Sequence, residues 1–263
     1  MPPILTLTTD FGLQDHFVAA MKGVVLTIAP TAQIIDITHQ ITPFDINEAA
    51  FTLAEAWRYF PKKTVHVVVV DPGVGSTRRP ILAQAGGQSF IAPDNGVLSL
   101  IYEQEPKTKV RHITAGKYMR DEVSQTFHGR DIFAPAAAHL AKGTAVASFG
   151  KLIEDPVKLP GIRPHRSGRR AWSGTILKID RFGNLITNFS RTEFPTLTSM
   201  KFSLTAGLEQ IIWLRSSYAE APFGEPFAIW GSSGYLEVSL NQGNAAKQLG
   251  VGVGAPAELE LIG

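Results

Sequence analysis

The sequence lacks cysteine, long apolar runs and any strong excess of one charge, and each absence excludes a class of protein. Zero Cys in 263 residues excludes a disulfide scaffold, a thiolate zinc site and a cysteine nucleophile. The longest apolar runs, such as residues 67–70, are far too short to cross a bilayer. The first residues, MPP, lead directly into an apolar run without the pattern of a secretory signal. We therefore expect a cytoplasmic protein without a membrane partner.

Charge and composition indicate a globular protein that does not bind nucleic acid. The formal net charge is +2, too small for a nucleic-acid footprint, and 44% hydrophobic residues exclude wholesale disorder. Residues 156–171 are rich in Pro, Gly and Arg and lack apolar periodicity, so we interpret them as an interdomain linker. The alternative is a phosphate or nucleic-acid patch, formed by Arg163, Arg166, Arg169 and Arg170. We favour the solvated linker because no stacking aromatics are interleaved with these charges.

Residues 1–155 alternate between strand and helix patterns. Strands are predicted at 4–8, 33–37, 65–70, 81–85 and 90–92, and helices at 17–28, after Asp45 and from Asp131 to Leu140. Asp45 and Asp131 are the predicted N-caps, and the nearly all-Val run 65–70 is typical of a strand covered on both faces. This alternation predicts a three-layer α/β domain with a mostly parallel sheet.

Residues 172–263 change to a pattern of short strands separated by turns. Strands are predicted at 175–179, 185–189, 202–204, 211–214, 227–230, 236–240 and 257–261, with no long helical stripe between them. We expect a smaller, all-β domain that is barrel-like.

The first strand ends in an acidic residue. Asp10 follows the apolar run 4–8, and open α/β sheets bind ligands at the carboxyl ends of their strands. A carboxylate at this position can accept both hydroxyls of a ribose or hold a metal ion. The alternative for Asp10 and for Asp15 is an interaction with the dipole of the following helix. We favour a function for Asp10 and, on this evidence alone, the dipole interaction for Asp15.

Two further loops carry charged groups in the N-terminal half. The loop VDPGVGSTR at 70–78 matches neither the dinucleotide fingerprint nor the Walker A pattern. Asp71 and Arg78 can meet across it, either in a site or as a surface ion pair of little energetic value. His128 precedes a predicted helix and can be a base, a ligand or a capping contact. No HExxH, no GxSxG and no set of histidines at metal spacing occurs, so no metal or cofactor is expected.

The C-terminal half has two polar segments. Asp180, Phe182 and Asn184 combine an acid, an aromatic ring and an amide, which suits an ammonium group and a purine; the alternative is an Asx-rich hairpin turn. The second segment contains the hydroxyl groups of Ser232 and Ser233, followed by an amide-rich turn with Asn241 and Gln242. Together these groups can bind a carboxylate. The alternative is a Gly-Ser turn into an edge strand.

Taken together, these segments resemble the S-adenosylmethionine hydroxide adenosyltransferase family, which is related to the enzymes that form a carbon–halogen bond at the adenosyl C5′. The resemblance extends from about residue 4 to residue 261 and keeps the order of all motifs. They are LTTDFG, DITHQITPFDI, VVVVDPGVGS, APDNG, TFHGRDIFAP, IDRFGNLITN and SSGYLEVSLNQGNA.

The resemblance implies an adenosine-forming hydrolysis of S-adenosylmethionine in a homotrimer with interfacial active sites. Asp71, Arg78 and His128 correspond to the triad that marks the hydrolytic branch; Arg79 is adjacent, and only the spacing of seven residues selects Arg78. The other implied roles are ribose binding by Asp10, a position near the ribose and sulfonium for Phe44, methionine binding by Asp15, Asp180 and Ser232, and contacts around adenine by Phe182, Asn184 and the main chain near Gln242.

Three alternatives to this hydrolysis are a halide adenosyltransferase, a non-catalytic sensor, and a metal-dependent nucleoside hydrolase that uses Asp10, Asp15 and Asp94. The triad argues against the first two. A neutral thioether leaves from a sulfonium without an acid, so the chemistry must supply the nucleophile. An Arg beside the water favours hydroxide character, and a His with a pKa near 6.5 can take the proton or orient the water.

Overall fold

The chain divides into two compact units in a computed structural model that describes residues 2–160 and 163–262. The units are Met1–Leu159 and Pro160–Gly263, and each is described by itself. Residues of the expected linker 156–171 pack against the unit on either side of it. The Val157 N–H donates to Asp94 at 2.9 Å, and β8 (His165–Arg166) pairs with β9 (Ala171–Ile179). Residues 161 and 162 of that linker lie outside the described residues.

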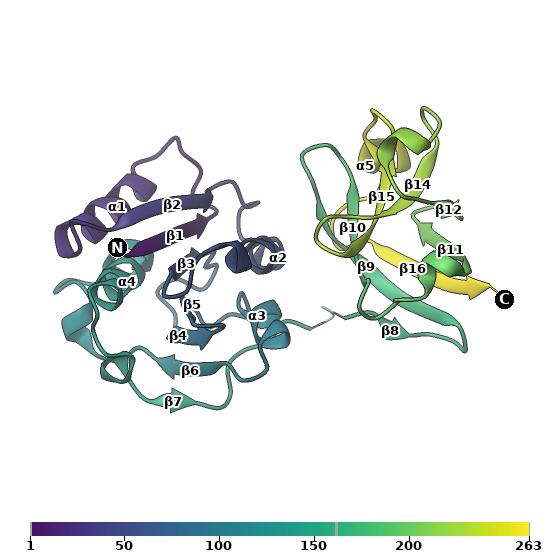
Figure 1. The fold of residues 1–263 in the computed structure, drawn as a ribbon. Coiled ribbons are helices and arrows are strands. Elements are labelled where there is room, and N and C mark those ends of the chain that lie inside the picture. Colours follow the sequence, from purple (N-terminus) through teal and green to yellow (C-terminus); the bar gives the residue numbers. More distant parts are fainter. Residues whose placement is uncertain (1, 161–162, 263) are drawn as a thin grey trace. The chain divides into compact units, whose positions relative to one another are not determined.

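The N-terminal unit alternates strands and helices, as the sequence predicts (Figure 1). Its strands are β1 (Ile4–Thr9), β2 (Gln33–Thr38), β3 (Val65–Val69), β4 (Pro80–Ala85), β5 (Gln88–Pro93), β6 (Lys109–His112) and β7 (Leu152–Ile153). Its α-helices are α1 (Phe17–Ile28), α2 (Ile46–Ala56), α3 (Ser99–Gln104) and α4 (Ala134–Ala141). Short 3₁₀ turns occupy Trp57–Tyr59, Gly116–Tyr118 and Val146–Phe149, and a π-helical turn occupies Gly129–Phe133.

The sheet of this unit has the order β2-β1-β3-β5-β4-β6-β7 among the described residues. The pairs β1–β2, β1–β3 and β3–β5 are parallel, whereas β4–β5, β4–β6 and β6–β7 are antiparallel. The sheet, which the sequence predicts to be mostly parallel, is thus parallel across β2, β1, β3 and β5. Its antiparallel part follows from the tight turn at Gly86 and Gly87, both at positive φ, which joins β4 directly to β5.

Helices cover both faces of the sheet and make three layers. Alternate residues of β1 point to opposite faces, so Leu5 and Leu7 pack with Met21 of α1 and Ala137 of α4 in one buried cluster. The α2 and α3 helices lie over the other face (Figure 1). Because α1 and α2 leave β1 and β2 toward opposite faces, the strand order reverses between β1 and β3. A ligand crevice is expected there, at the carboxyl ends of these strands.

Of the two helix N-caps predicted from local signals, one is confirmed and one is wrong. Asp45 is the N-cap of α2 as predicted, and its carboxylate accepts from the Glu48 N–H at 2.9 Å. The predicted cap Asp131 is wrong: it lies inside the π-helical turn before α4. It is completely buried and paired with Arg130, and its carboxylate accepts from the Ser124 N–H at 2.9 Å. Asp131 therefore closes the preceding loop instead of starting the helix.

The C-terminal unit is an all-β domain whose described residues include one short α-helix and the 3₁₀ turns Leu197–Ser199 and Tyr218–Glu220. Its further strands are β10 (Leu185–Ser190), β11 (Lys201–Ala206), β12 (Glu209–Ile211), β13 (Leu214–Arg215), β14 (Pro226–Trp230), β15 (Tyr235–Leu240) and β16 (Pro256–Ile262), and its helix is α5 (Ala245–Leu249). The sheet order is β12-β11-β16-β9-β10-β15-β14-β13. The long β9 pairs with β16 in its first half and β10 in its second, so strands from both sides share one core. This curling gives the expected barrel-like form.

None of the helices within residues 2–160 and 163–262 combines the length and the apolar character needed to span a membrane.

Candidate active site

Two predicted acidic residues lie side by side where the strand order reverses. Thr9 at the end of β1 is in register with Val69 at the end of β3, so Asp10 and Asp71 leave adjacent strand ends. The Asn95 side-chain amide donates to the Val70 carbonyl at 2.8 Å and fixes the chain just before Asp71. The APDNG motif, which is distant in sequence, therefore supports this strand end.

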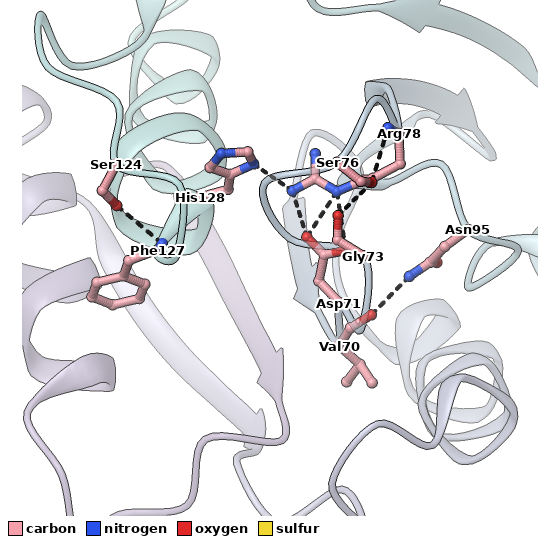
Figure 2. A network of polar contacts seen from close by, with 9 residues as sticks. All are labelled: Val70, Asp71, Gly73, Ser76, Arg78, Asn95, Ser124, Phe127 and His128. Carbon is pink, nitrogen blue, oxygen red and sulfur yellow. Dashed lines mark hydrogen bonds and ion pairs between the residues drawn. The ribbon is translucent and has the colours of Figure 1, made fainter.

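Asp71 and Arg78 form a multiply bonded ion pair across the loop that follows β3 (Figure 2). Arg78 Nε donates to Asp71 Oδ1 at 3.0 Å and to Oδ2 at 2.8 Å, and Nη2 donates to Oδ2. The Arg78 side chain is only 9% exposed and the Asp71 side chain only 4%. Low exposure and several bonds distinguish this pair from a surface ion pair.

His128 completes a three-residue network with this pair. Its Nδ1 lies 2.6 Å from Arg78 Nη2, and Figure 2 shows the guanidinium between the carboxylate and the imidazole. The Arg78 guanidinium also lies over the buried Phe133 ring, 5.1 Å from its centroid. The structure thus brings together all three predicted triad residues, although His128 is 50 residues from Arg78.

A glycine allows the two loops of the triad to approach each other. Gly75 has φ +78°, and a Cβ built on it would lie 2.4 Å from the Gln125 carbonyl oxygen. A side chain at residue 75 would therefore separate the loop 71–78 from the segment that carries His128. The Ser76 hydroxyl donates to the Gly73 carbonyl at 2.6 Å and closes the same loop.

The neighbouring arginine has a separate role. Arg79 donates from Nε to Asp94 at 2.7 Å and from Nη1 to Asp155 at 2.9 Å. The structure therefore distinguishes Arg78 from Arg79, where the sequence offered only spacing. Asp94, a proposed metal ligand of the metal-dependent alternative, is buried and occupied by its ion pair with Arg79. Across the residues that the structure describes, no three His, Asp or Glu side chains are grouped as metal ligands.

The electrostatics favour a neutral imidazole at His128. Burial lowers its pKa, and the positive charge of Arg78 lowers it further, whereas Asp71, Asp131 and the Ser124 main chain act in the opposite direction. Burial also raises the pKa of the Asp10 carboxyl. The Phe44 N–H opposes that rise, and the charge of Asp71 adds to it.

A cavity of about 240 Å³ lies against these groups. Asp10, Asp71 and His128 line it together with apolar side chains, which are Phe11, Phe17, Pro43, Phe44, Val69, Val74 and Phe127, and with Thr126 and Gly129. The rings of Phe11, Phe17 and Phe127 contact one another, with centroids 5.1–5.9 Å apart. Sequence reasoning missed this aromatic wall because its members come from separate segments. The only signal was that Phe11 and Phe127 lie within the motifs LTTDFG and TFHGRDIFAP.

Phe44 and Asp10 are linked at the mouth of the cavity. The Phe44 N–H donates to Asp10 Oδ2 at 2.9 Å, and Phe44 has φ +68°, a conformation that is strained for a residue with a side chain. Its ring is 70% exposed. Asp15, in contrast, is exposed in the loop before α1 and does not line this cavity.

In the C-terminal unit, Asp180 and Asn184 form the Asx-type turn that the sequence offered as an alternative. Asp180 Oδ1 accepts from the Phe182 and Asn184 N–H groups, both at 2.9 Å, and Oδ2 accepts from the Asn184 side-chain amide at 2.8 Å. The turn presents the Phe182 ring outward, 77% exposed. A ligand role for these residues is compatible with the turn, because a carboxylate has further acceptor positions.

The other polar residues of this unit lie near the ends of β14 and β15. Ser232 is exposed and Ser233 half-buried in the turn between the two strands. Asn241 donates to the Ala221 carbonyl at 2.8 Å, and Gln242 is exposed with φ +53°. Sequence reasoning missed Glu237, a buried carboxyl whose side chain fills the space beside the Gly231 backbone.

An α/β unit with this triad at its strand ends, followed by a barrel-like β unit, matches one family over most of the chain. The SAM hydroxide adenosyltransferase N-terminal domain matches residues 5–150, and the corresponding C-terminal domain matches residues 174–258. The chain belongs to the SAM hydroxide adenosyltransferase family.

Relatives with assigned names agree with this membership. The chain is 35% identical to an (R)-S-adenosyl-L-methionine hydrolase of Thermus thermophilus, over 98% of this chain and 100% of that protein. It is 37% identical to a protein of the same name from Salinispora tropica, over 95% and 94% of the two chains. A fluorinase of Actinoplanes sp. is 29% identical over 91% of each. The crystal structure of a conserved protein from Thermotoga maritima has a TM-score of 0.88 at 35% identity, covering 97% of this chain and 99% of that one.

Proposed function

We propose that the protein hydrolyses S-adenosyl-L-methionine at C5′ and releases adenosine and L-methionine. The observation that carries the proposal is the network of Asp71, Arg78 and His128 at the wall of a cavity at the strand ends, in a chain of this family. Hydrolases of this name are 34–37% identical to the chain, whereas fluorinases are 25–29% identical. Because the relatives are named for the (R) sulfonium epimer, we propose that epimer as the preferred substrate.

The reaction needs an oriented nucleophile more than an acid. The sulfonium leaves as a neutral thioether, so the leaving group requires no proton. Asp10 would bind the ribose hydroxyls and place C5′ beside the network, where a water in line with the C5′–S bond can attack. The apolar side chains that line the cavity support this proposal, because they would limit the access of bulk water to C5′ and the attacking water.

We assign the remaining predicted residues to substrate binding. Phe44 would contact the ribose and sulfonium, and Asp15, Asp180, Ser232 and Ser233 the methionine part. Phe182, Asn184, Asn241 and Gln242 would contact adenine and its surroundings. We propose that the C-terminal residues act from a neighbouring subunit of a homotrimer, and that the enzyme is cytoplasmic. No metal or cofactor is proposed, because a cation would repel the sulfonium.

Mass spectrometry in ¹⁸O-labelled water tests the proposal directly. Purified protein is incubated with epimer-resolved S-adenosylmethionine in chloride-containing buffer. We expect ¹⁸O-labelled adenosine and methionine, with the (R) epimer consumed first. Formation of 5′-chloroadenosine would assign the protein to the halide-transferring branch, and bound but unconverted substrate would favour a sensor. Faster loss of the (S) epimer would contradict only the epimer assignment.

A further inference from the structure

The arrangement around Arg78 decides which nitrogen of His128 carries a proton. Arg78 Nη2 lies 2.6 Å from His128 Nδ1, and a guanidinium has only donors and keeps its charge in proteins. Nδ1 must therefore accept this hydrogen bond with its lone pair. In the neutral ring the proton is then on Nε2, and no lone pair of the imidazole remains free to take a proton from water.

Arg78 itself lies behind the groups that face the cavity. Asp71 and His128 both line the cavity, whereas the Arg78 guanidinium packs over the buried Phe133 ring. Nε and Nη2 of Arg78 are bonded to Asp71, and Nη2 also to His128. One rigid, planar group thus fixes the orientations of both cavity-facing side chains.

From this geometry we propose that His128 is not the base of the hydrolysis: it is an Nε2-protonated positioning residue that holds Arg78, and the Asp71 carboxylate accepts the proton. This inference rests on the proposed function for its reaction, but its statement about the tautomer of His128 does not. It excludes for His128 the role of proton acceptor that the sequence left open.

A weak base suffices for this reaction. As the water oxygen bonds to C5′, the C5′–S electron pair moves to sulfur and the neutral methionine thioether leaves. The attacking water becomes a protonated alcohol, which is far more acidic than a carboxylic acid. Its proton passes to Asp71 and then to solvent, so the net products are adenosine, methionine and one proton. Asp71 keeps acceptor capacity for this step, because most of its bonds to Arg78 fall on Oδ2.

Nitrogen NMR of ¹⁵N-histidine-labelled protein measures the tautomer without substrate. The His128→Gln variant identifies the His128 signals among the seven histidines. We expect an unprotonated Nδ1, which resonates far downfield, and a protonated Nε2 at neutral pH. A protonated Nδ1 would overturn the proposal. If this pattern is found in a protein that fails to hydrolyse S-adenosylmethionine, the proposed function fails while the tautomer assignment stands.

Two variants of nearly equal size separate positioning from base catalysis. The amide oxygen of His128→Asn can accept from Arg78 but cannot take a proton, whereas His128→Leu can do neither. We expect kcat to fall about tenfold in the Asn variant and at least a hundredfold in the Leu variant. We also expect the Asn variant to keep the wild-type shape of the kcat/KM profile from about pH 5 to 9. Equal losses in both variants, or an acid limb that disappears in the Asn variant, would overturn the proposal.

Discussion

The two units carry their predicted site residues in different ways. In the N-terminal unit, Asp71, Arg78 and His128 contact one another, and Asp71 and His128 line one cavity with Asp10. In the C-terminal unit, the carboxylate of Asp180 accepts hydrogen bonds within its own turn, and the Phe182 ring of that turn projects to solvent. The groups to which we assign the chemistry are therefore held in place within one unit. Among the C-terminal residues, Phe182, Ser232 and Gln242 are exposed, whereas Asn184 is buried within the Asp180 turn.

This difference predicts different kinetic consequences in the two units. Substitutions in the N-terminal network should lower kcat, because we propose that these groups act on the transition state. Substitutions in the C-terminal turns should raise KM, because we propose that their contacts with the substrate last throughout the reaction. The following predictions test this division, from the largest expected effect to the smallest.

The largest effect is expected for Asp71→Asn. The amide cannot accept both Arg78 donors as a carboxylate does and cannot take a proton, so we expect kcat to fall about 10³-fold. Substrate affinity, measured by calorimetry, should change less than about threefold. Single-turnover kinetics separate the chemical step from product release. A raised KM with an unchanged kcat would place Asp71 among the binding residues and break the division.

The second effect is expected for Gly75→Ala, which touches no substrate. The new Cβ would lie 2.4 Å from the Gln125 carbonyl and separate the Asp71 loop from the His128 segment. A displacement of about 1 Å costs roughly a hundredfold in rate, so kcat should fall by about that factor.

Gly143→Ala is the matched control for this variant. Gly143 also has a positive φ, +99°, but a Cβ there would have open space around it. It imposes the backbone strain without the steric contact, so its kcat should stay near the wild-type value while its stability falls. A similar loss of kcat in both variants would show that general destabilisation, and not loop separation, is responsible.

The sequence predicted the elements whose signals are local. The 3.6-residue spacing of α1 and the cap at Asp45 depend on neighbouring residues, and both predictions are confirmed. The role of Asp131 depends on the Ser124 main chain and could not be read from its position before an apolar run. The aromatic wall of the cavity joins three segments, so it follows from the fold alone.

Much of the site was predictable because its motifs resemble those of a known family. Spacing alone selected Arg78 over Arg79, and the structure supplies the physical reason: Arg79 is engaged by Asp94 and Asp155. The tautomer of His128 was not predictable, because it is set by the side chain that its Nδ1 faces.

The third effect concerns acid stability, in which the units should also differ. His66 is buried between Thr6 and Gln88, and burial lowers its pKa from 6.5 to about 4. Between about pH 4 and 6.5, His66 is therefore protonated in the unfolded chain but neutral in the folded state. The stabilisation is present above pH 6.5 and is lost as the pH falls toward 4. At pH 5 the loss is about 2 kcal/mol.

Hydrogen exchange read by mass spectrometry can assign this loss to one unit. Peptides covering β3 should lose protection at pH 5, and His66→Asn should reduce this dependence. In the C-terminal unit, burial raises the pKa of Glu237 from 4.5 to about 7, so its stabilisation is full below pH 4.5 and is lost as the pH rises to about 7. Glu237→Gln should remove this loss between pH 4.5 and 7. Equal acid loss in both units would contradict the prediction.

The smallest effect is expected at Asp180, where the charge and the turn can be separated. Asp180→Asn keeps an oxygen that can accept from the Phe182 and Asn184 N–H groups but removes the negative charge. We expect KM to rise about tenfold with kcat within twofold, because the substrate ammonium that we propose Asp180 binds would lose its partner. Asp180→Ala should raise KM further and also lower the melting temperature, because it removes the acceptors of the turn. A wild-type KM in the Asn variant would show that Asp180 serves the turn alone.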